Sequence, residues 1–251
     1  MNHRQRMITT VVGLFLTLGA VSTLHAQSEI YSLPSAAVTD KNSAYCETDA
    51  NPAITPSGTG TYMQRCMGGV AKGFELGVNG LAAFSNPPTP GEIQPTVKYQ
   101  WLNHGNLQFA SGVTGFIPVT HTSDETAFAE LYTVGRYQTK LKDLGGYSPA
   151  FSAGAWALVG RQSGTGSREG VILGIEQPLV LDKTGAPKVS FVTDWQSGNQ
   201  THAGFSSANS GVVVNLPHNL VAAFGYSFSN LGRKYDTPAF WLGYTFKFRK
   251  K

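Results

Sequence analysis

Residues 240–248 read Phe-Trp-Leu-Gly-Tyr-Thr-Phe-Lys-Phe, and every second residue is an aromatic ring or a leucine. The apolar set is Phe240, Leu242, Tyr244, Phe246 and Phe248. Side chains alternate between the two faces of a β-strand, so a period of two predicts a strand with one apolar face. The intervening positions include a glycine, a threonine and a lysine, and they form a second face that is more polar.

The same alternation recurs through most of the chain. Ten such segments of roughly nine to fourteen residues follow one another, around Phe74, Val97, Leu107, Leu131, Phe151, Val171, Val189, Val212, Leu220 and Phe240. A strand that crosses a bilayer at a tilt needs about 9–11 residues, whereas strands of soluble proteins usually have about 5–6. The segment lengths therefore favour strands that span a membrane.

The connections between these segments alternate between short and long. Short turn-rich pieces such as 104–106 alternate with longer polar stretches such as 85–94 and 230–238. This pattern is typical of outer-membrane barrels of Gram-negative bacteria, which have tight turns at one end and loops at the other. The connections 141–149 and 179–187 are longer than the pattern favours. We predict an all-β fold, an antiparallel transmembrane up-and-down β-barrel.

The number of strands is either ten or twelve. Ten strands already place both chain ends on the periplasmic side. Residues 61–70 would add one strand before Phe74, and an even count then requires another strand within 28–46. We slightly favour twelve, because the residues that precede Thr61 would otherwise form a long arm without structure.

The distribution of charge indicates which face of each strand meets lipid. Only 14% of the residues are charged, and within the segments they fall almost entirely on the face opposite the apolar side chains. Lipid-facing positions must be apolar, whereas a soluble barrel would carry its charges outside. The low total charge favours lipid outside. The residues predicted to line the lumen are Glu75, Lys98, Glu130, Arg136, Trp156, Glu176, Asp194 and Trp241. The same face carries Gly77, Gly112, Gly154, Gly174, Gly211, Gly225 and Gly243.

The N-terminus carries the features of an export signal. A basic start, an apolar run over 8–24 and a small residue at Ala26 predict a signal peptide over residues 1–26 that is cleaved. We therefore expect the cell outer membrane as the location. The remaining chain divides into an N-terminal segment, 27–60, with a possible first strand and loop, and a barrel, 61–251.

Cys46 and Cys66 are the two cysteines of the chain. In an exported protein an even pair favours a disulfide, which would close a loop of about 20 residues and stabilise the fold by roughly 3 kcal/mol. Two free or buried thiols are the alternative. A zinc site is not expected, because two cysteines without a nearby histidine provide too few ligands.

The end of the chain contains a short assembly motif. Gly243, Phe246 and Phe248 resemble the terminal β-signal by which outer-membrane proteins are presented to the barrel-assembly machinery. That resemblance implies the assembly machinery and the outer-membrane lipid as partners. The chain departs from the usual motif, because residues 249–251 (Arg-Lys-Lys) follow the last aromatic residue.

A second resemblance lies near the middle of the first half of the chain. Residues 69–78 (Gly-Val-Ala-Lys-Gly-Phe-Glu-Leu-Gly-Val) form a strand–turn–strand pattern with an acidic alternating second strand. This pattern resembles a family of outer-membrane barrels labelled as phenol-degradation (meta-pathway) transporters. The resemblance is strong over about ten residues, and elsewhere it extends to the pattern alone. It implies a small to medium barrel with a transport role.

The sequence carries no recognisable catalytic motif. Ser229-Asn230 lacks the histidine two positions before the serine that barrel lipid hydrolases use, so no base would activate the serine. Phosphate-binding and dinucleotide-binding motifs are also missing, and no basic face for nucleic acid is visible. We therefore expect no enzyme activity, no cofactor, no metal and no nucleic-acid partner.

Two functions remain open. The first is a barrel for passage or binding of small molecules, hydrophobic ones included, with a narrow or partly blocked lumen. The second is a structural or adhesive barrel with a filled lumen, in which the loops 85–94 and 230–238 bind partners. The identity of the solute does not follow from the sequence.

Overall fold

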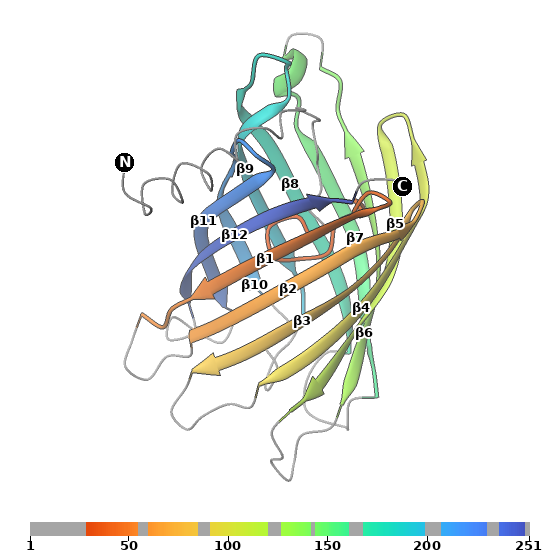
Figure 1. Cartoon of the computed structure of the whole chain (residues 1–251), viewed down its shortest axis with the longest axis vertical. Coiled ribbons are helices and arrows are strands. Elements are labelled where there is room, and N and C mark those ends of the chain that lie inside the picture. The colour runs from red at the N-terminus through yellow and green to blue at the C-terminus, as the bar shows by residue number, and fades with distance from the viewer. Residues whose placement is uncertain are drawn as a thin grey trace, which may run out of the picture.

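The computed structural model describes residues 29–54, 60–84, 91–119, 127–141, 144–160, 168–198, 207–229 and 236–248. Within these residues, twelve antiparallel strands form one closed barrel (Figure 1). Each strand pairs with its neighbours in the chain, and β1 closes the barrel by pairing with β12. The predicted signal peptide lies outside the described residues.

The strand bounds confirm the up-and-down barrel and the choice of twelve strands. The elements are β1 (Ser43–Asn51), β2 (Gly60–Ala71), β3 (Phe74–Phe84), β4 (Glu92–His104), β5 (Leu107–Pro118), β6 (Phe128–Gln138), the short helix η1 (Gly145–Tyr147), β7 (Ala150–Val159), β8 (Glu169–Leu181), β9 (Pro187–Gln196), β10 (Ser207–Asn215), β11 (Leu220–Ser229) and β12 (Thr237–Lys247). In the described part of the chain, no helix has the length and apolar character needed to cross a membrane.

The first strand lies later in the chain than expected. We predicted it within 28–46, but β1 covers Ser43–Asn51. Its outward positions are Ala44, Cys46, Thr48 and Ala50, which are small or polar, so the apolar alternation that marks the other strands is missing. Strand β1 is held instead by its pairing, with β12 on one side and β2 on the other.

The pairing of β1 with β2 places Cys46 directly opposite Cys66, and the two cysteines form a disulfide. The bond joins neighbouring strands on the outer face of the barrel. It therefore links β1 covalently to β2 at the place where the chain first enters the barrel wall.

The two faces of the barrel differ as the charge pattern predicts. Leu131, Leu173 and Leu242 point outward and are about half exposed, at 46%, 46% and 53%. Glu75 and Asp194 point inward and are 1% exposed. A single sheet with apolar side chains outside and charged ones inside is the reverse of a soluble barrel.

Tight hairpins gather at one end of the barrel. The chain turns there between β2 and β3, between β4 and β5, between β8 and β9 and between β10 and β11. His218 and Asn219 in the last of these turns have positive φ angles of 64° and 63°, a conformation that histidine and asparagine adopt more readily than most residues. We call this end the turn end, and the opposite end, where longer connections lie, the loop end.

The connection predicted over 179–187 is shorter in the structure, because β8 continues to Leu181 and leaves residues 182–186 as the turn. Asp182 Oδ1 accepts hydrogen bonds from the backbone N–H groups of Thr184 (2.7 Å) and Ala186 (3.0 Å). The Thr184 hydroxyl and these N–H groups lower the pKa of the Asp182 carboxyl. The connection between β6 and β7 contains η1 and remains long.

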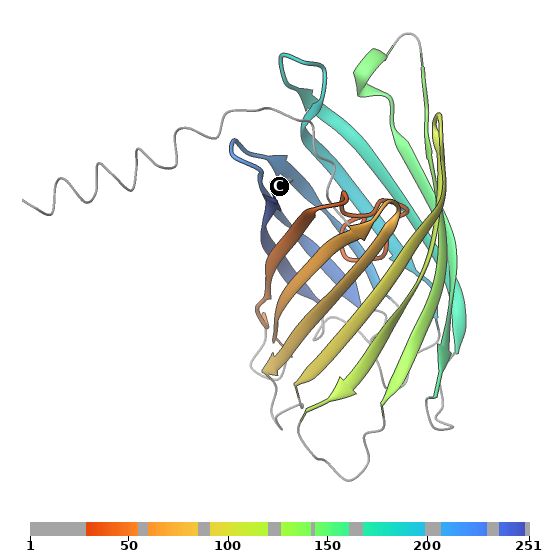
Figure 2. The same cartoon turned by 45° about the vertical axis from the view of Figure 1, so that its right-hand side comes forward.

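The chain that precedes β1 lies inside the barrel. Figures 1 and 2 show it as a red-orange loop surrounded by the strands. We call residues 29–42 the plug. Ile30, Tyr31, Leu33 and Ala36 of the plug belong to a buried apolar cluster to which every strand from β5 to β12 contributes. The N-terminal part of the segment 27–60 therefore fills space within the lumen.

Candidate functional site

Asp194 of β9 binds the plug through its buried carboxylate. Its Oδ2 accepts hydrogen bonds from three consecutive backbone N–H groups, those of Tyr31, Ser32 and Leu33, at 2.9, 2.8 and 2.9 Å. Its Oδ1 accepts a fourth from Asn209 Nδ2 at 2.7 Å. A buried carboxylate is costly unless hydrogen bonds replace its water, and here the plug supplies most of them.

The wall opposite Asp194 holds the second half of the plug. Glu75 Oε2 accepts a hydrogen bond from the backbone N–H of Thr39 at 2.6 Å. Lys98 Nζ donates to the carbonyl of Ala37 at 2.8 Å, and it also lies 3.5 Å from Glu75 Oε1. Gln100, which lies next to Lys98 on the inner face of β4, donates through Nε2 to the carbonyl of Ala36 at 2.7 Å. Carboxylates thus bind the N–H groups of the plug, and donors bind its carbonyls.

Arg65 of β2 joins the first residue of the plug to the wall. It forms ion pairs with Glu29 and with Asp49, the latter at 2.7 Å, and its Nε lies 3.5 Å from Glu47. Three acids therefore surround one guanidinium on the inner face of the barrel. Tyr45 completes this cluster, because its hydroxyl donates to Glu47.

Glycines on the wall make room for the apolar side chains of the plug. A Cβ built on Gly174 would lie 2.7 Å from Ile30 Cδ1. A Cβ on Gly211 would lie 2.5 Å from Tyr31 Cε2, and one on Gly225 would lie 2.5 Å from the Tyr31 hydroxyl oxygen. These distances are shorter than van der Waals contact, so a larger residue at any of the three positions would displace the plug side chain that it meets.

Gly69 allows the backbone of the plug to pass close to β2. A Cβ there would lie 2.3 Å from the carbonyl oxygen of Thr39 and 2.2 Å from that of Asp40. The backbone N–H of Asn42 donates to the carbonyl of Gly69 at 3.0 Å, and Lys41 forms a parallel bridge with Gly69. The plug therefore joins β1 through a backbone contact that no other residue type would permit without a shift.

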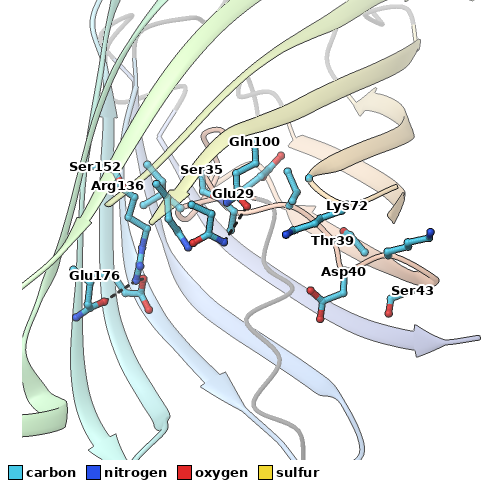
Figure 3. Close-up of a pocket in the computed structure, with 18 of the residues that line it drawn as sticks. Glu29, Ser35, Thr39, Asp40, Ser43, Lys72, Gln100, Arg136, Ser152 and Glu176 are labelled. Carbon is cyan, nitrogen blue, oxygen red and sulfur yellow. Dashed lines mark hydrogen bonds and ion pairs between the residues drawn. The ribbon is translucent and has the colours of Figure 1, made fainter. Parts of the chain in front are cut away.

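A cavity of about 1420 Å³ lies between the plug and the turn end. Figure 3 shows that plug residues such as Ser35, Thr39 and Asp40 line it on one side. On the other side Arg136 of β6 donates to Glu176 of β8 at 2.9 Å (Figure 3). This pair is partly exposed and lines the cavity. Among the described residues, the structure records no hydrogen bond or ion pair between Arg136 or Glu176 and the plug.

The predicted lumen residues all lie on the inner face. Besides those already described, Glu130 is buried and accepts a hydrogen bond from Gln196 at 3.1 Å. Trp156 donates through Nε1 to the carbonyl of Ser197 at 3.1 Å. The ring of Trp241 lies 6.5 Å from that of Tyr31. The structure thus brings Asp194, Glu75, Lys98 and Trp241 together around the plug, and it leaves Arg136 and Glu176 in the cavity.

The residues of the predicted assembly motif lie on β12 and directly after it. Gly243 faces the lumen, where a Cβ would collide with the Tyr45 hydroxyl. Phe246 and Phe248 are exposed, at 45% and 60%. Their role in assembly stays a prediction.

Sequence reasoning missed Glu47, Asp49 and Arg65, together with the plug itself. Glu47 and Asp49 lie two residues apart, which places both carboxylates on one face of a strand. That spacing is a signal for a strand, but the small or polar residues at the alternate positions of β1 hide the apolar face by which the other strands are recognised. In the part of the chain that the structure describes, no group of three His, Cys, Asp or Glu side chains could hold a metal ion.

No protein-family model matches the chain, and no curated protein matches it in sequence. The resemblance of residues 69–78 to the phenol-degradation transporters therefore stays a prediction. The hairpin that this stretch implies is present, with the turn at Lys72 and Gly73 between β2 and β3.

Solved structures of several outer-membrane barrels are similar to this one. The KdgM porin matches with a TM-score of 0.53 and 10% identity, over 82% of this chain and 99% of its own. The NanC porin matches with a TM-score of 0.54 and 9% identity, over 81% and 100%. An outer membrane channel from Pseudomonas putida F1 matches with a TM-score of 0.51 and 11% identity, over 90% and 99%. At these identities the likeness establishes the fold, which is that of a porin-like β-barrel.

Proposed function

We propose that the protein is an outer-membrane channel for small molecules and that the plug closes it at rest. The observation that carries the proposal is the path of the plug. It contacts β2, β3 and β4 through Arg65, Glu75 and Lys98, and it contacts β9 through Asp194. A segment held on opposite sides of a barrel obstructs passage through it.

The outer surface supports the membrane location. Large apolar side chains such as Leu131, Phe224 and Leu242 are exposed there, at 46%, 59% and 53%. A soluble barrel would lose free energy by exposing such a surface to water, whereas lipid accommodates it. The similar solved structures, which are named as porins and as an outer membrane channel, are consistent with this location and with transport.

The way in which the plug is bound supports its release. Ordering a residue costs about 1–2 kcal/mol of backbone entropy, and the plug buries three large apolar side chains, Ile30, Tyr31 and Leu33. The polar contacts that hold it each contribute modestly, so the backbone entropy regained on release would offset a large part of the attachment. Cleavage after Ala26, as the sequence predicts, would leave the plug attached to the barrel at one end.

The inner wall also supports a solute with an apolar part. Tyr132, Trp156 and Trp241 contribute aromatic rings to the buried cluster that encloses the plug, next to the acids described above. Hydrophobic small molecules, which the sequence analysis includes among the candidates, would find apolar surface there once the plug has left.

A structural or adhesive barrel is the second candidate, and the filled lumen favours it. The plug and the strands from β5 to β12 form one buried apolar cluster, which could serve stability alone. The loop residues 85–90 and 230–235, which would bind partners in this case, lie outside the described residues. The two candidates differ in whether loosening the plug opens a pathway.

The substitution Gly174→Val tests this difference in the intact chain. The added side chain would take the space of Ile30, whose burial contributes about 1.5–3 kcal/mol. We expect liposomes that contain this variant to swell faster in small uncharged solutes than liposomes with the unchanged protein. The matched control is Gly80→Val, since a Cβ at Gly80 meets no atom within 4 Å. Equal swelling of all three proteins would favour the structural barrel.

A further inference from the structure

The seat of Tyr31 combines a buried carboxylate with an aromatic pocket. Tyr31 is 2% exposed, and its backbone N–H donates to Asp194 Oδ2 at 2.9 Å. Its ring lies over Gly211 and Gly225, beside the ring of Trp241. Its hydroxyl donates to the carbonyl of Ala239 at 3.3 Å. One residue of the plug thus uses three features of the wall at once: an acid, a ring pocket and a carbonyl acceptor.

Loss of the plug would leave these features without their occupant. Asp194 would lose three of the four hydrogen bonds described for it while remaining inside the barrel. An ammonium group carries a positive charge and three N–H donors, so it can replace the three backbone N–H donors that Asp194 would lose with the plug. The Trp241 indole N–H is buried and has no hydrogen-bond partner among the described residues, and the Trp241 ring lies 6.5 Å from that of Tyr31.

We propose that this seat is a binding site for small aralkylammonium solutes, in which an aromatic ring is joined by a short chain to an amine. The amine takes the place of the N–H groups of residues 31–33 on Asp194, and the ring takes the place of the Tyr31 ring above Gly211 and Gly225. A hydroxyl on the ring would donate to Ala239 as that of Tyr31 does. The proposal rests on the proposed function, because the plug must leave the seat before a solute enters.

Titration calorimetry on a chain that lacks residues 29–39 tests the site directly. The probes are tyramine and tyrosol, which replaces the amine of tyramine by a hydroxyl. We expect tyramine to bind about tenfold more tightly than tyrosol, because its charge is paired with a buried carboxylate. Asp194→Asn in the same shortened chain is expected to abolish this preference. Glu169→Gln, which removes a carboxylate from the exposed start of β8, is expected to retain it.

Equal affinity for the two probes, or a preference that persists without the Asp194 charge, would overturn the proposed site. This outcome is separate from failure of the channel, since calorimetry reports binding whether or not the barrel conducts. If the shortened chain does not refold, hydrogen exchange of residues 29–42 in the intact chain provides the readout. Tyramine is expected to accelerate that exchange and tyrosol is not, and an unchanged exchange with tyramine would count against the site.

Discussion

A chain that lacks residues 29–39 is expected to conduct continuously in a planar bilayer, whereas the intact chain is expected to remain closed for most of the recording. The deletion removes the part of the plug that contacts Arg65, Glu75, Lys98 and Asp194. It retains Asp40, whose carbonyl accepts the hydrogen bond of Ser43 at the start of β1. Since the closed state can no longer form, the open fraction should approach one.

The control for this deletion is the folded state of the shortened barrel. A folded barrel migrates faster on a denaturing gel before heating than after it, and the shortened chain should retain that difference. A folded but silent shortened chain would show that the wall itself closes the lumen. The plug would then be a structural element rather than a gate.

The substitution Asp194→Asn is expected to open the intact channel for a larger share of the time. An amide is uncharged and offers one oxygen acceptor, and a hydrogen bond to a charged group contributes about 1.5–3 kcal/mol. Loss of that contribution should raise the ratio of released to bound plug about 10- to 100-fold. The side chain that changes is buried and holds three N–H groups of the plug, so the effect should exceed that of any other single substitution of similar size.

Single-channel recording measures this ratio as the open fraction. Glu169→Gln is the matched control, because it makes the same acid-to-amide change at an exposed position. An open fraction that is the same in Asp194→Asn, in the control and in the unchanged protein would show that Asp194 does not hold the plug.

The sequence was sufficient to predict the barrel because most of its strands have one apolar face. Along β12 the outward residues Phe240, Leu242, Tyr244 and Phe246 leave a clear period of two, which predicts a strand with one apolar face. Strand β1 lacks that signature, since its outward side chains are small. Its place could be inferred from parity, but its bounds depend on pairing with β2 and β12, which are distant in the sequence.

The plug could not be predicted, because its contacts are long-range and use its backbone. Residues 29–42 show no apolar period of two, as in a strand, or of three to four, as in a helix. The residues that bind them are distant in the sequence. Glu75 lies 36 positions from Thr39, and Asp194 lies 163 positions from Tyr31. The alternation predicts that the lumen glycines share the inner face of the strands. That Ile30 packs against Gly174 and Tyr31 packs against Gly211 is known only from the structure. The sequence therefore identifies the face of the strands that carries the glycines, and the structure shows that the plug packs against that face.

Hydrogen–deuterium exchange of residues 29–42 in the intact, folded protein tests the central claim most directly, since it reports whether the plug is bound inside the barrel. Amides that donate to buried acceptors exchange slowly, and Tyr31, Ser32, Leu33 and Thr39 all donate to buried carboxylates of the wall. We predict that this segment exchanges far more slowly than the same peptide free in solution, and that Asp194→Asn accelerates it. Exchange at the rate of the free peptide would contradict the account, because the segment would then be an arm outside the lumen.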